Sequence, residues 1–146
     1  DLITEIEEGR RTCEVANLDL LAAYQRLQER APALNAVITE LPPGERAADG
    51  PLHGVAVAVK DNIDVAGVVT TNASTVAVPP PASADAPAVA RLRDAAADLL
   101  CKTNLLEYAA GSVNPVYGMT YNPHDPTRTS GGSRSCWRSG PWALPR

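Results

Sequence analysis

The stretch GVAVAVKDN, from Gly54 to Asn62, constrains the fold most, because a run of small apolar residues ends there in a lysine. Valine and alanine alternate along it, so neither side of the segment is polar. Such a run is typical of a strand buried on both faces, as in a parallel sheet covered by helices. The carboxyl ends of parallel strands are where α/β proteins place their chemistry.

Two roles stay open for Lys60 on these residues alone. The strand can simply surface there, so that the ammonium group meets water. Alternatively, the side chain is half-buried, and desolvation then favours the neutral amine, which can act as a base.

Two segments carry the apolar spacing of helices. We predict one helix over Cys13–Arg30, with Thr12 as its cap and Pro32 as its stop. We predict a second over residues 86–97, with Asp85 as its cap and a proline in its first turn.

Short apolar segments alternate with these helices. Residues 33–39 and 98–102 are predicted strands, and the second again ends in a lysine, Lys102. The proline-rich segment 78–87 is expected to have no regular structure, and residues 121–133 are expected to form a loop. This alternation indicates an α/β fold.

Composition excludes several classes of protein. The 146 residues suit one domain, and a net charge of −4 argues against a nucleic-acid binder. We expect no membrane span, because no apolar run is long enough. Three cysteines without a C-x-x-C pair favour a reducing, cytoplasmic setting, and two distant histidines argue against a metal site. No cofactor is predicted.

The loop ends in TSGGS, residues 129–133, where hydroxyl groups flank two glycines. Paired glycines allow positive φ and bring backbone N–H groups close to a ligand. Three readings stay open: a flexible turn, a phosphate cradle that lacks the usual phosphate-loop pattern, or a catalytic hydroxyl near a lysine base.

Three blocks, PLHGVAVAVKDNIDVAGVVTT, KTNLLEYAAGS and NPHDPTRTSGGS, occur in this order, and together they resemble the amidase signature family. The resemblance extends over nearly all of Leu2–Ser133. It implies that residues 1–133 are the N-terminal part of an amidase domain, an α/β fold with a mixed central sheet covered by helices.

The resemblance also implies a function. Members of this family are serine hydrolases that cleave carboxamides through a Ser–cis-Ser–Lys triad. Lys60 corresponds to the base and Ser133 to the cis-serine that relays the proton. The implied partner is a small-molecule amide, and a homodimer is compatible with the family. The implied substrate-binding residues are Ser130, Gly131, Gly132, Tyr108 and Gly111.

The likeness ends after Ser133. The nucleophile of the family lies in a D-x-G-G-S-type block that this sequence does not contain. Residues 134–146 hold both tryptophans and no acidic residue, and we interpret them as a divergent tail, off-frame or truncated. We therefore expect these 146 residues to hydrolyse no amide alone and to be marginally stable.

Two alternatives stay open beside a hydrolase of simple amides. One is the A-type subunit of glutamyl-tRNA amidotransferase, which takes ammonia from glutamine and works with other subunits. The other is a catalytically dead remnant. Near the base, Asp61 and Asn62 are expected to position Lys60 through hydrogen bonds, and Lys102 is expected to pair locally rather than to act as a second base.

Overall fold

The structure is a computed structural model that describes residues 13–42, 44, 47–110 and 113–130. Within these ranges three strands form one mixed sheet in the order β1-β3-β2. They are β1 (Val37–Glu40), β2 (Ala56–Lys60) and β3 (Asp98–Thr103). β2 runs parallel to β3, and β1 runs antiparallel to it, so the expected mixed α/β sheet is present.

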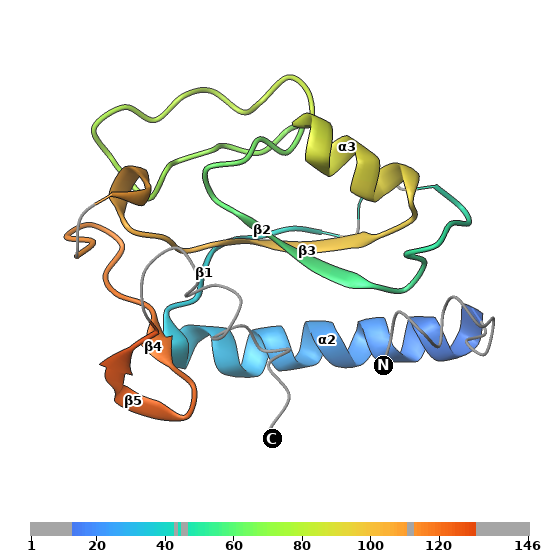
Figure 1. Cartoon of the computed structure of the whole chain (residues 1–146), viewed down its shortest axis with the longest axis horizontal. Helices are drawn as coiled ribbons and strands as arrows, with labels where there is room; N and C mark the ends of the chain where they lie inside the picture. The colour runs from blue at the N-terminus through green and yellow to red at the C-terminus, as the bar shows by residue number, and fades with distance from the viewer. Residues whose placement is uncertain (1–12, 43, 45–46, 111–112, 131–146) are drawn as a thin grey trace.

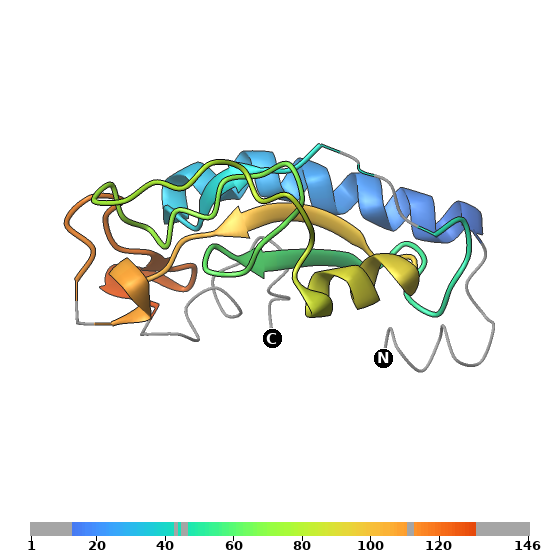
Figure 2. The same cartoon turned by 90° about the horizontal axis from the view of Figure 1, so that it is seen from above.

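The sheet is the middle of three layers. Helix α2 (Cys13–Leu34) covers one face, and the shorter helix α3 (Pro87–Asp94) lies on the other (Figure 1, Figure 2). Neither helix has the length and apolarity needed to cross a membrane, as far as the described ranges extend.

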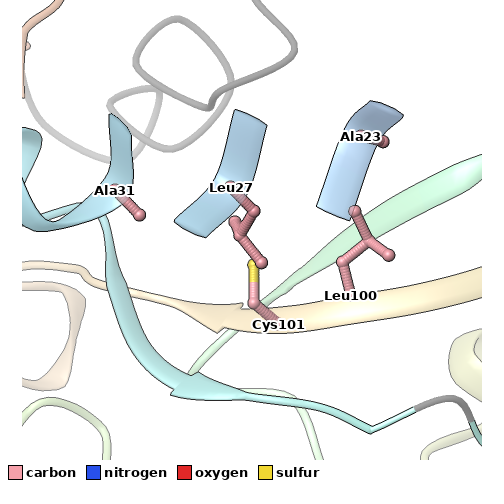
Figure 3. Close-up of a cluster of buried hydrophobic side chains, with 5 residues drawn as sticks. All are labelled: Ala23, Leu27, Ala31, Leu100 and Cys101. Atoms are coloured by element: carbon pink, nitrogen blue, oxygen red, sulfur yellow. The ribbon is translucent and has the colours of Figure 1, made fainter. Parts of the chain in front are cut away.

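The core beneath α2 combines helix residues spaced four apart with two residues of β3. Its buried members are Ala23, Leu27, Ala31, Leu100 and Cys101 (Figure 3). Spacing by four puts the helix residues on one face. Leu100 and Cys101 are consecutive yet both belong to this core, because the β2–β3 register shifts between Val57 and Ala58. Tyr24 packs against the same core; burial first, then the charges of Asp98 and Cys101, raise the pKa of its phenol.

A second core lies beneath α3. It joins Val89 of the helix to residues of both parallel strands and of the loop after β2, and its buried members are Leu41, Val59, Val65, Val89 and Leu99. The two cores use alternate residues of β2: Ala56 and Ala58 pack toward α2, whereas Val57 and Val59 pack toward α3.

The central strand is β3 rather than β2. All six residues of β3 are buried, whereas Val59 is the one residue of β2 in that class. The expectation that β2 is buried on both faces is therefore met only in part. In the described sheet β3 has a hydrogen-bonded neighbour on each side and β2 has one, which explains the difference.

Two predictions about helix ends were wrong. α2 continues through Pro32 to Leu34 instead of stopping at Arg30, because Ala31 and Leu34 are buried and favour the added turn. The predicted cap, Thr12, lies outside the described residues. α3 begins at Pro87 and already ends at Asp94.

The predicted cap of α3, Asp85, does not cap it. The cap position is Ala86, which makes no side-chain cap bond. The Asp85 carboxylate instead accepts a hydrogen bond from the Ala66 amide at 2.7 Å and pairs with Arg93 at 2.8 Å. The pair joins the loop before α3 to the last turn of that helix.

The segment predicted as a loop, residues 121–133, contains a small hairpin. Strands β4 (Tyr121–Asn122) and β5 (Asp125–Thr129) pair antiparallel. The proline-rich segment 78–86 has neither helix nor strand, as predicted.

Candidate active site

Both lysines of the chain lie at the ends of parallel strands, at the same edge of the sheet. The arrowheads of β2 and β3 point the same way, toward the end where the β4–β5 hairpin and the short 3-10 turn η1 (Glu107–Ala109) lie (Figure 2). In the parallel register Lys60 lies opposite Thr103, and Lys102 lies opposite Val59. The backbones of the two lysines are therefore close together at the ends of neighbouring strands.

Lys60 is half-buried and follows Ala56 and Ala58 in the alternation of β2. Those alanines pack toward α2, so the Lys60 side chain leaves the strand on the α2-facing side of the sheet. Its carbonyl accepts a hydrogen bond from the Ile63 amide at 3.0 Å, which closes a turn directly after the strand.

Lys102 has a different environment, because its ammonium group is enclosed with an acid. Its Nζ lies 2.9 Å from Oδ1 of Asp61, and both side chains are fully buried. Nζ also donates a hydrogen bond to Oγ1 of Thr70 at 3.1 Å. Lys102 was expected to pair or cap locally; it does pair, but with an acid that follows a different strand.

Asp61 connects the ends of both parallel strands with the loop after β2. Its amide donates to the Thr103 carbonyl at 3.1 Å, and its own carbonyl accepts from the Asn72 amide at 3.0 Å. Oδ2 accepts from the Thr71 amide at 3.2 Å and from the Thr71 hydroxyl. Asp61 was expected to bond to Lys60 directly, but these contacts of its carboxylate are to Lys102 and Thr71; Asn62, the other expected partner, is exposed.

Tyr108 joins this edge through the backbone. Its amide donates to the Asn72 carbonyl at 2.9 Å, so the η1 turn is attached to the segment that Asp61 holds. Tyr108 and Ala109 have φ of 49° and 57°, a left-handed geometry that is uncommon for residues other than glycine. The Tyr108 side chain is 51% exposed.

Ser130 is anchored to the residue that precedes β4. Its hydroxyl and its amide both donate to the Thr120 carbonyl at 3.0 Å, which fixes the end of the β4–β5 hairpin. The remaining predicted site residues lie outside the described residues, and their placement beside Lys60 stays a prediction: Gly111, Gly131, Gly132 and Ser133.

Sequence reasoning missed Thr70 and Thr71, which complete the polar surroundings of Asp61 and Lys102. Both threonines lie in the segment after β2, which turns at Gly67 with a positive φ of 76°. A signal was present, because two consecutive hydroxyl residues follow a run of valines there. Buried acids need such donors.

One cavity of the described chain has polar residues in a lining that excludes Lys60. A cavity of about 350 Å³ opens beside α3 and includes the Arg93–Asp85 pair in its lining, but not Lys60. No three side chains of the metal-binding types come together within the described ranges.

Comparison with known proteins identifies the family. Residues 11–135 match the profile of the Amidase family. The A subunit of glutamyl-tRNA(Gln) amidotransferase from Azoarcus sp. (strain BH72) is 40% identical over 146 residues, covering 90% of this chain and 30% of that protein. An amidase of Pseudomonas putida is 51% identical over 82 residues, covering 56% of this chain and 17% of that protein.

The fold agrees with a solved member. The crystal structure of the glutamyl-tRNA(Gln) amidotransferase A subunit from Thermotoga maritima superposes with a TM-score of 0.77 at 29% identity, covering 93% of this chain and 30% of that one. The chain thus spans about a third or less of the length of these relatives. It belongs to the amidase family.

Proposed function

We propose that this chain forms the N-terminal part of a cytoplasmic serine hydrolase that cleaves carboxamide C–N bonds, with Lys60 as the general base. The observation that carries the proposal is the contrast between the two lysines. Lys102 is committed to a buried ion pair, whereas Lys60 is half-buried at the carboxyl end of a parallel strand. Family membership and the amidases among its relatives support the reaction class.

The proposed chemistry moves one proton through two serines. The neutral amine of Lys60 takes a proton from the Ser133 hydroxyl, and Ser133 takes one from the hydroxyl of the nucleophilic serine. That serine attacks the amide carbonyl, and backbone N–H groups stabilise the oxyanion. The proton returns to the leaving nitrogen as the C–N bond breaks, which leaves an acyl-enzyme for water to hydrolyse.

The substrate would lie between this edge of the sheet and the glycine-rich loop. We assign binding roles to Tyr108, Gly111 and residues 130–132, with backbone N–H groups of the loop directed at the substrate. The nucleophile belongs to the D-x-G-G-S-type block of the family, which the 146 residues do not contain. A homodimer is compatible with this proposal.

A second candidate is an A-type amidotransferase component that releases ammonia from glutamine within a larger assembly. The name of the Azoarcus relative and the Thermotoga structure favour it. Simple amides and glutamine distinguish the two, because the second candidate hydrolyses glutamine in preference to other amides and gains activity when its partner proteins are added.

The test is a chimaera in which residues 11–133 replace the matching segment of the Pseudomonas putida amidase. We expect Lys60→Ala to lower kcat by about 10²–10⁴-fold, the usual contribution of a general base. Lys60→Arg should fail as well, because a guanidinium group stays protonated. Ser133→Ala should keep more activity, since water can replace a relay hydroxyl more readily than a base.

The matched control is Arg128→Ala, which removes an exposed charge of the hairpin and should leave kcat unchanged. Near-normal turnover in the Lys60→Arg chimaera would mean that Lys60 acts by charge alone. A folded but inactive parent chimaera would count against the proposal as a whole.

A further inference from the structure

The buried pair of Asp61 and Lys102 needs an explanation beyond stability. Removing two opposite charges from water costs free energy, and their mutual attraction often does no more than offset that cost. A buried ion pair is therefore weak evidence for a stabilising role. Here the charges are also well supplied with polar partners, since Thr70 accepts from Lys102 and Thr71 donates to Asp61. A structural role for the pair is therefore to be sought in the chain segments that its two residues connect.

Both chain neighbours of Lys60 contact the carboxyl end of β3. On the C-terminal side, the Asp61 backbone bonds to Thr103 and Asn72, and its carboxylate bonds to Lys102. On the N-terminal side, Val59 is buried and lies opposite Lys102 in the β2–β3 register. Lys60 thus sits between two residues that are fixed against the carboxyl end of β3.

The pair lies on the other face of the sheet from the Lys60 side chain. Lys60 follows the alanines that face α2, whereas Val59, the register partner of Lys102, belongs to the core beneath α3. Asp61 and Lys102 therefore act on Lys60 through the backbone, without entering the site in which Lys60 would meet a substrate.

We propose that Asp61 and Lys102 are positioning residues for Lys60: together with Thr70 and Thr71 they form a buried clamp that sets the direction in which the base leaves β2. The catalytic part of this inference rests on the proposed function of Lys60. Through the Asn72–Tyr108 hydrogen bond, the same clamp also fixes the distance between the base and the η1 turn.

The first test uses the whole 146-residue chain and does not depend on catalysis. Lys60 and Lys102 are the only lysines in the sequence, so isotope-labelled lysine gives two assignable sets of NMR signals. In the parent we expect Lys102 ammonium protons that exchange slowly and a Lys60 backbone order parameter near the rigid value of about 0.85.

The decisive variant is the double change Asp61→Asn with Lys102→Met, because each single change leaves a buried charge without its partner and can prevent folding. We expect the double variant to fold and the order parameter of Lys60 to fall below about 0.6. The control, Arg93→Gln, removes an ion pair beside α3 and should leave Lys60 rigid. A rigid Lys60 in the folded double variant, or loss of folding in that variant, would overturn the clamp.

The second test places the double change in the amidase chimaera. A positioning role predicts that kcat falls at least tenfold while KM changes less than twofold, even where the melting temperature equals that of the parent. Unchanged kcat with a disordered Lys60 would refute the catalytic part. If Lys60→Ala itself leaves kcat unchanged, the proposed function is wrong, and Asp61 and Lys102 cannot be positioning a base. The NMR result would still decide whether these two residues order Lys60.

Discussion

Lys60 and Lys102 are two lysines with the same sequence signature and different environments. Each follows an apolar run, AVAV or LLC, and each lies at the end of one of two neighbouring parallel strands. Yet Lys60 is half-buried, whereas the Lys102 side chain is fully buried 2.9 Å from Asp61. The acid that follows Lys60 in the sequence pairs across the sheet with the other lysine. Adjacency along the chain therefore does not identify an ionic partner.

The position of each strand explains the difference. β3 is hydrogen-bonded on both sides, so a charge at its end cannot reach water and needs an acid. β2 has one neighbour in the described sheet, and the end of that strand stays partly accessible. The sequence pattern indicated that a lysine ends each strand, but the order of the strands decided which lysine is fully buried.

The largest expected effect comes from replacing each lysine with methionine. Lys102→Met leaves the Asp61 carboxylate buried without its counter-charge, which should lower the free energy of unfolding by about 3–5 kcal/mol. Lys60→Met removes a half-buried amine and should change the free energy of unfolding by less than about 1 kcal/mol. Urea denaturation followed by circular dichroism measures both. Equal losses for the two variants would break the comparison.

The next prediction concerns chemical access to the two amines. A limiting amount of an amine-acylating reagent should modify Lys60 at least about ten times faster than Lys102, because the Lys102 side chain has no exposed surface and is paired. Peptide mass spectrometry after short reaction times measures the ratio. In urea the two rates should converge, and a ratio near one in the native chain would contradict the assigned burial.

The smallest expected effect comes from replacing Thr70, which accepts a hydrogen bond from the Lys102 ammonium group. Thr70→Val keeps the shape of the side chain but removes the acceptor 3.1 Å from Lys102, so stability should fall by about 1.5–3 kcal/mol, the usual range for a hydrogen bond to a charged group. The control is Arg128→Ala, which breaks an exposed pair with Asp125 and should cost less than about 1 kcal/mol. Equal losses of stability in Thr70→Val and Arg128→Ala would contradict a specific contribution of Thr70.

Much of the architecture was predictable because it depends on local patterns. The apolar runs predicted the strands that end at Lys60 and near Lys102, and the prolines predicted the irregular segment before α3. Errors arose where a distant contact outweighed a local preference. Pro32 did not stop α2, because Ala31 and Leu34 are buried. Asp85 became the partner of Arg93 instead of a helix cap.

The sequence by itself determined the family and the class of the fold, because three ordered blocks and two apolar runs are visible without coordinates. Only the tertiary structure decided which lysine takes the Asp61 carboxylate and which threonines complete that cluster. Ionic partners depend on distance and burial in three dimensions, and the contact from Lys102 to Asp61 crosses from one strand end to the next.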